Sequence, residues 1–159
     1  MTRTTITSAL LTAAMALGCG GDAPEPEAAP AQTSAAPAAG EPLTAVELEQ
    51  GIGPIRDLTL APVDPDLAAK GEQAFTLKCS ACHKIGERYV APPLGTVLSR
   101  RRPEFVMNMM LNATEMVQRH PEIQELLAEY FTPMTVQVTD QSEARAILEY
   151  LRSVQTASQ

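Results

Sequence analysis

The most reactive cluster of residues in this 159-residue chain is a run of five that begins at Cys79 and ends at His83. Cys79 and Cys82 stand three positions apart, and His83 follows the second cysteine directly. Two thiols at this spacing, at the end of a helix, can each form a thioether with one vinyl group of a haem, and the next imidazole can then bind the iron. The pattern therefore predicts one covalent haem c, attached through Cys79 and Cys82, with His83 as an iron ligand.

Three other uses of the cysteine pair fit the sequence less well. A zinc site would need a second cysteine pair and a more distant histidine. A thioredoxin-like redox pair would need surrounding strands, and a disulfide over so short a span would add little stability. The third cysteine, Cys19, lies near the N-terminus, and an odd number of cysteines excludes a complete disulfide framework.

Helices are predicted on both sides of the motif, and no segment shows the alternation of a strand. The helix starts are marked by capping residues or by proline, at Asp64-Pro65, Pro103, Pro121 and Asp140. The first helix leads directly into Cys79, and the helix from Pro121 is either separate or a restart of the preceding one. The residues from Asp140 to Glu143 fit a capping box. The predicted fold class is all-α.

Residues 63–159 resemble a class I, mitochondrial-type monohaem c cytochrome. Besides the cysteine motif, the matching residues are Gly71 and Phe75 in the first helix, Pro92 and Leu94 after the motif, Thr132-Pro133-Met134, and Tyr150-Leu151. The resemblance implies a small fold of about four helices wrapped on one haem, with the last helix crossing the first at Gly71. It also implies that the Pro92 carbonyl accepts a hydrogen bond from His83 and that Met134 is the second axial ligand. One departure is Ala91, where the family has glycine.

Other residues compete with Met134 for the second axial position. Three methionines lie in the helix predicted from Pro103, where methionine is usually core: Met107, Met109 and Met110. Of these, Met107 is the one expected to be less buried. Met116, on a turn or short helix, is a stronger rival. His120 precedes Pro121 and fits a helix junction better than an iron ligand.

A haem with two axial protein ligands has no open position for a substrate, and thioether ligation stabilises Fe(II). The resemblance therefore implies a carrier of single electrons between redox protein partners and not an enzyme. The alternative is a haem-based peroxidase or gas-sensing domain with a displaceable sixth ligand. That function would need a base above the iron, for which His120 is the one candidate in the sequence.

Basic residues surround the motif and form either a solvated surface or a positive rim that docks an acidic partner. They are Lys78, Lys84, Arg88, Arg100, Arg101 and Arg102. Residues 52–55, 107–112 and 126–130 resemble monohaem cytochromes associated with bacterial nitrous oxide reductases. That resemblance implies a respiratory complex or a terminal reductase, such as nitrous oxide reductase, as the redox partner.

The N-terminal residues are predicted to be a targeting signal. A single positive charge at Arg3, a short apolar stretch and small residues at its exit are typical of an export signal over residues 1–18. The four residues up to Cys19 resemble a bacterial lipobox with two positions reversed, which makes Cys19 the lipid anchor. The alternatives are an ordinary signal cut nearby or an uncleaved anchor. We expect a periplasmic location, lipid-anchored or soluble, and Gly20 after the cysteine favours the outer membrane.

Composition divides the rest of the chain. Residues 19–42 are rich in Pro, Ala and Glu and are predicted to be a disordered tether, residues 43–62 an extended arm, and residues 63–159 the domain. The net charge of −7 belongs mostly to the segment before residue 63, and it excludes a general nucleic-acid-binding surface. No apolar run reaches the length of about 18 to 20 residues that a membrane-spanning helix needs.

Overall fold

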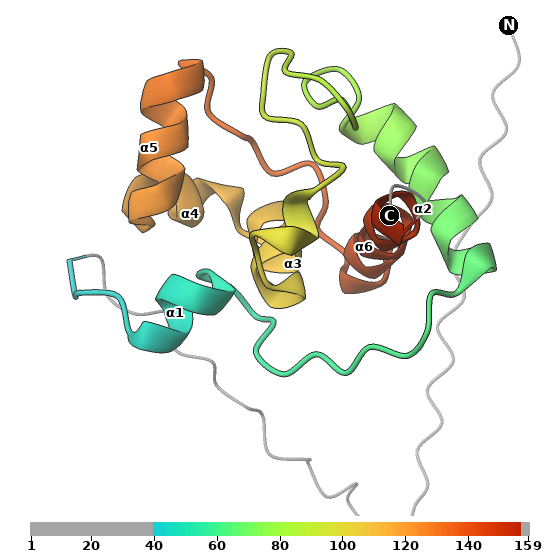
Figure 1. Ribbon diagram of the computed structural model, residues 1–159. Helices are drawn as coiled ribbons and strands as arrows, with labels where there is room; N and C mark the ends of the chain where they lie inside the picture. Colours follow the sequence, from blue (N-terminus) through green and yellow to red (C-terminus); the bar gives the residue numbers. More distant parts are fainter. Residues whose placement is uncertain (1–39, 157–159) are drawn as a thin grey trace, which may run out of the picture. The chain divides into compact units, whose positions relative to one another are not determined.

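The computed structural model describes residues 40–156, which belong to one compact unit (Figure 1). Its helices are α1 (Ala45–Gln50), α2 (Pro65–Lys78), the 3-10 helix η1 (Val97–Ser99), α3 (Pro103–Leu111), α4 (Ala113–Arg119), α5 (Pro121–Tyr130) and α6 (Gln141–Thr156). Residues 40–156 contain no strand, which confirms the all-α fold class. Helix α1 was not predicted, and α4 lies where a turn or short helix was expected at Met116. The predicted signal, Cys19 and most of the tether lie outside the described residues.

The packing of α2 against α6 sets the position of the cysteine motif. Asp64 caps α2 by accepting hydrogen bonds from the backbone N–H groups of Asp66 and Leu67. A Cβ atom on Gly71 would lie 1.9 Å from the carbonyl oxygen of Ala146, so only glycine lets the two helices approach this closely. Figure 1 shows α2 and α6 in contact, as the family resemblance implies.

One turn beyond this crossing, the rings of Phe75 and Tyr150 pack with their centroids 5.3 Å apart. At the start of α6, the Asp140 carboxylate accepts hydrogen bonds from the N–H groups of Ser142 and Glu143, as a helix cap should. The Glu143 side chain, predicted to complete a capping box, instead accepts a hydrogen bond of 2.7 Å from Lys78 Nζ. This ion pair fastens the last turn of α2 to α6 immediately before Cys79.

The middle of the chain is divided into three helices by residues that interrupt the backbone ladder. Asn112 ends α3 and stands at the N-cap position of α4 without a side-chain capping bond, and its φ of −137° is not helical. Pro121 has no N–H and disfavours helical geometry in His120, so α5 is a separate helix and not a continuation. Met107 is buried with 2% exposure, which corrects the expectation that it would be less buried than its neighbours.

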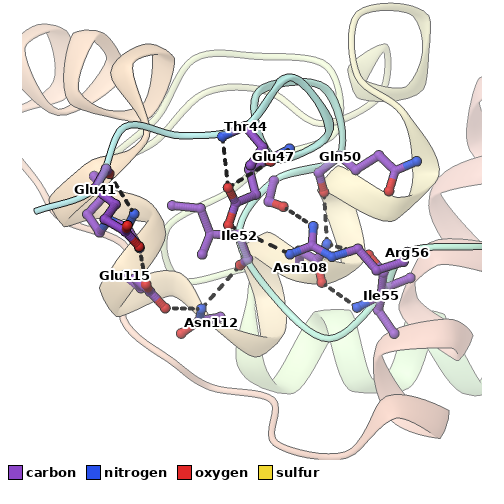
Figure 2. A network of polar contacts seen from close by, with 12 residues as sticks. Glu41, Thr44, Glu47, Gln50, Ile52, Ile55, Arg56, Asn108, Asn112 and Glu115 are labelled. Carbon is purple, nitrogen blue, oxygen red and sulfur yellow. Dashed lines mark hydrogen bonds and ion pairs between the residues drawn. The ribbon is translucent and has the colours of Figure 1, made fainter. Parts of the chain in front are cut away.

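The arm, residues 43–62, packs on α3 and α4 through polar contacts (Figure 2). Thr44 and Glu47 form a capping box at the start of α1, which the sequence analysis did not predict. Asn108 is completely buried and bonds the arm three times, by accepting from Ile55 N–H and donating to the carbonyls of Gln50 and Ile55. The arm is therefore part of the folded unit.

Candidate functional site

A cavity of about 450 Å³ lies between the end of α2, the segment that leads into α3, the inner face of α5 and the segment that precedes α6. Its walls are mainly apolar. Five residues singled out from the sequence line it: Cys79, Cys82, His83, Pro92 and Met134. Residues that lie far apart along the chain are thus brought to one space.

The cysteine motif forms a tight turn at the end of α2. The N–H groups of Cys82 and His83 both donate to the carbonyl of Cys79, at 3.0 and 2.8 Å, so the two thiols and the imidazole face the same cavity. Both cysteines are free thiols. Burial, assisted by the negative charge of Glu143, raises the pKa of Cys79 to about 11. A thiol of such high pKa is a poor nucleophile, which argues against a thioredoxin-like redox pair.

The His83 ring is fixed in one tautomer. Its Nδ1 lies 2.9 Å from the carbonyl oxygen of Pro92, and because a carbonyl only accepts, the ring proton is on Nδ1. Burial lowers the pKa of His83, so the ring is neutral at pH 7 and Nε2 keeps its lone pair. The neighbouring Ala91 N–H donates to the carbonyl of Cys82 and holds Pro92 in reach.

The structure separates Met134 from Met116, its strongest rival. Met134 is half-buried and lines the cavity. Met116 does not line it, because Met116 is completely buried under the arm, where its sulfur accepts a hydrogen bond of 3.0 Å from Ile52 N–H. Met109 and Met110 line the wall, whereas Met107 does not.

His120 also lies away from the cavity. It is completely buried, and its Nε2 donates to the carbonyl of Leu48 at a distance of 3.2 Å. Its ring packs edge-on against Phe105 with the centroids 5.0 Å apart. His120, the candidate for the base that a peroxidase would need, is therefore hydrogen-bonded to the arm instead.

The donors around the cavity fit a covalent haem better than any other group. Two free thiols, a neutral imidazole and a thioether surround an apolar space, which is the ligand set of haem c. Among residues 40–156 there is no group of three or more His, Cys, Asp and Glu side chains that could hold a metal ion, as a zinc site would need. No described helix is long and apolar enough to cross a bilayer.

Most of the basic residues around the motif are paired within the chain. The ion pairs are Lys78–Glu143, Arg88–Glu129, Arg101–Glu122 and Arg102–Glu104. Lys84 donates to the carbonyl of Ser80 and lies 4.8 Å from the ring centroid of Tyr89. These pairs weaken the positive potential of the rim, because each cation has an anion at contact distance.

The apolar face of α5 has a role that the sequence analysis did not assign. Leu126, Leu127 and Tyr130 recur at helical spacing, which by itself indicates a packing face, and they line the cavity. The amphipathic stripe was the available signal, but a stripe that covers a haem and one that covers a core have the same period.

An all-helical chain with this set of donors on one apolar cavity defines a haem protein of the c type. The family model described as Cytochrome c matches residues 68–155, more than half of the sequence, so the chain belongs to the cytochrome c family. It therefore binds one covalent haem c, and haem-based electron transfer is the general activity of its family. The class I identification made from the motifs is consistent with this membership.

Solved structures agree with the family assignment. A cytochrome c from Rhodothermus marinus is 45% identical, with 70% of this chain and 97% of that chain covered and a TM-score of 0.67. An engineered form of that cytochrome, Rma TDE, is 44% identical, with 69% and 96% covered and a TM-score of 0.65. The same engineered form bound to a carbene intermediate is 43% identical, with 69% and 96% covered and a TM-score of 0.63. No curated protein matches the chain.

Proposed function

We propose that this chain carries single electrons between redox proteins, with Cys79 and Cys82 attaching the haem and His83 and Met134 binding its iron. The observation that carries the proposal is that His83 and Met134, from distant parts of the chain, line the same apolar cavity. When bound, a haem with such ligands cycles between Fe(II) and Fe(III). Pro92 keeps the proton on His83 Nδ1, and the apolar wall excludes water.

A carrier is favoured over a peroxidase or gas sensor by the side chains around the cavity. Its lining residues in the described chain include no Asp, no Glu and no histidine besides His83. His120, the base considered from the sequence, is completely buried at the arm. The carboxylate or second imidazole that would serve as a base is therefore missing among the lining residues, whereas electron transfer needs no base.

Replacement of Met134 tests the proposal. Met134→Ala should remove the weak far-red absorption band that reports iron–Met ligation in the ferric protein. It should also open the iron to cyanide or carbon monoxide and lower the midpoint potential, because loss of the thioether destabilises Fe(II). Met116→Ala is the matched control and should leave all three properties nearly unchanged. A band that survives Met134→Ala, or a wild-type protein that binds carbon monoxide readily, would overturn the assignment.

The attachment through Cys79 and Cys82 has its own test. Acid–acetone extraction should leave the haem on the polypeptide, because thioether bonds resist this treatment. A Cys79→Ala, Cys82→Ala double variant should release the haem into the solvent. Extraction of haem from the wild-type chain would exclude covalent attachment through this pair.

We further propose that Cys19 is a lipid anchor and that the segment after it tethers the domain to the periplasmic side of a membrane. The support is the sequence up to Cys19 and the Pro, Ala and Glu composition that follows. Cys19→Ser should release the protein from the membrane fraction with its haem spectrum unchanged. Recovery of the wild-type protein in the soluble fraction would contradict the anchor.

The redox partner we propose is a respiratory complex or a terminal reductase, with nitrous oxide reductase as the first to test. The support is the sequence resemblance of residues 52–55, 107–112 and 126–130. The reduced chain should be oxidised by nitrous oxide reductase when its substrate is present. The rate should fall with salt only moderately, since most rim cations are already paired within the chain.

A further inference from the structure

Few contacts hold the segment from residue 132 to residue 139, which carries Met134. Within the described part of the chain, no hydrogen bond joins this segment to any residue outside it. Its one internal side-chain bond runs from Gln137 to Thr135. Val138, with 1% exposure, anchors the end next to α6. Met134 itself packs against the hydrophobic core, so its position depends on that packing and on what fixes the other end, where the segment leaves α5.

Arg88 fixes that other end. Its guanidinium forms an ion pair with the Glu129 carboxylate and donates to the Glu129 carbonyl at 3.2 Å. The same group lies 4.0 Å from the ring centroid of Tyr130. One side chain thus contacts a carboxylate, a backbone carbonyl and an aromatic ring in the last two residues of α5. An exposed ion pair alone would contribute little, but the additional carbonyl and ring contacts restrict the guanidinium to one geometry.

Arg88 comes from a loop that is itself well fastened. The loop after the cysteine motif is tied back by hydrogen bonds from Leu94 N–H to the Lys84 carbonyl and from Gly95 N–H to the Ile85 carbonyl. A further bond from Ala91 N–H reaches the carbonyl of Cys82. The side chain therefore links the part of the chain that carries His83 to the start of the segment that carries Met134.

We propose that Arg88 is a positioning residue that holds the end of α5 and thereby keeps Met134 at the cavity. This inference rests on the proposed function of Met134 as an axial ligand. An added ligand binds the iron only in molecules in which Met134 has moved away, so its apparent dissociation constant falls as that fraction grows. Loss of the Arg88 contacts should increase the fraction.

The test is a titration of the ferric, haem-loaded protein with imidazole. Arg88→Gln should lower the apparent dissociation constant about fivefold, the size expected from one exposed ion pair together with one cation–π contact. Glu129→Gln should give a smaller decrease, because it removes the ion pair and leaves the carbonyl and ring contacts. Arg119→Gln is the matched control: Arg119 pairs with Glu115 on α4 and does not line the cavity. The control should leave the constant unchanged.

The same titration in a Met134→Ala background distinguishes positioning of Met134 by Arg88 from a general effect of Arg88 on the haem site. With no methionine to displace, Arg88→Gln should change the constant less than twofold. The inference is overturned if Arg88→Gln leaves the dissociation constant unchanged when Met134 is present. It is also overturned if Arg88→Gln changes the constant equally in the Met134→Ala background. A far-red band that persists in Met134→Ala marks failure of the proposed ligand itself, which is a different result.

Discussion

The arm, residues 43–62, and the Met134 segment, residues 132–139, are held in opposite ways. The arm is bonded to α3 and α4 through buried amides and backbone groups, with Asn108 at the centre of the contacts (Figure 2). The segment from 132 to 139 forms no hydrogen bond to the rest of the described chain. Apart from Met134 and Val138, its side chains are exposed.

The difference follows from what each stretch packs against. The arm covers protein, so its backbone polar groups are buried and must find partners in α3 and α4. The Met134 segment borders the cavity, where haem-facing side chains need shape and a sulfur ligand more than polar partners. We therefore expect the arm to respond to the loss of hydrogen bonds and to pH, and the Met134 segment to respond to ligand competition.

The largest effect should come from Asn108 at the arm. Asn108→Ala would leave Ile55 N–H and the carbonyls of Gln50 and Ile55 without partners in a buried seam. This should lower the free energy of unfolding by about 3 to 5 kcal/mol, measured by denaturant titration of the haem-loaded protein. Gln137→Ala in the Met134 segment should change it by less than about 0.5 kcal/mol. Equal losses from the two variants would remove the contrast between the regions.

Acid should loosen the arm before it affects the other segment. Hydrogen bonding from the Thr44 backbone N–H, and then from its hydroxyl, lowers the pKa of Glu47 below its ordinary value of 4.5, although burial opposes the shift. The stabilisation is therefore complete above pH 4.5 and is lost as pH falls through the lower, folded-state pKa. The protection factors of residues 44–56, which correct the exchange rates for the intrinsic pH dependence of amide exchange, should fall in that window.

Residues 132–139 contain no titratable side chain, so their exchange should not follow the same titration. Glu47→Gln provides the control, because an amide keeps the shape of the side chain but does not titrate. It should abolish the acid dependence of exchange in the arm. Protection factors of the arm that stay constant between pH 6 and about pH 3 in the wild-type protein would contradict the role of Glu47.

The smallest effect should come from the turn at the end of α5. Phe131 has a φ of 55° and is 86% exposed, so it adopts left-handed geometry without packing that compensates for it. Phe131→Gly should raise the free energy of unfolding by about 0.5 kcal/mol, because relief of the strain outweighs the greater freedom of the unfolded chain. Phe131→Val should lower it, since a branched Cβ fits this geometry worse. A Gly variant less stable than the Val variant would show that the side chain of Phe131 stabilises the fold through contacts.

Much of this architecture could be predicted from short stretches of sequence. Helices begin where predicted, at Asp64 with Pro65, Pro103, Pro121 and Asp140, because capping by aspartate and the fixed geometry of proline both act within four residues. The family pattern assigned Gly71 to the crossing of the first and last helices, and its close approach to Ala146 agrees with that assignment. Helix α1 was missed because it is short, and α4 was predicted only as a turn or short helix at Met116 for the same reason.

The sequence alone determined the chemistry of the motif, since the spacing of Cys79, Cys82 and His83 is set by adjacent residues and by the rigid shape of the group they bind. It left Met116 as the strongest of several rivals to Met134. Only the tertiary structure placed Met134 at the cavity and Met116 beneath the arm, where Ile52 N–H occupies its sulfur. That choice depends on contacts between residues more than fifty positions apart, and no local pattern carries information about such contacts.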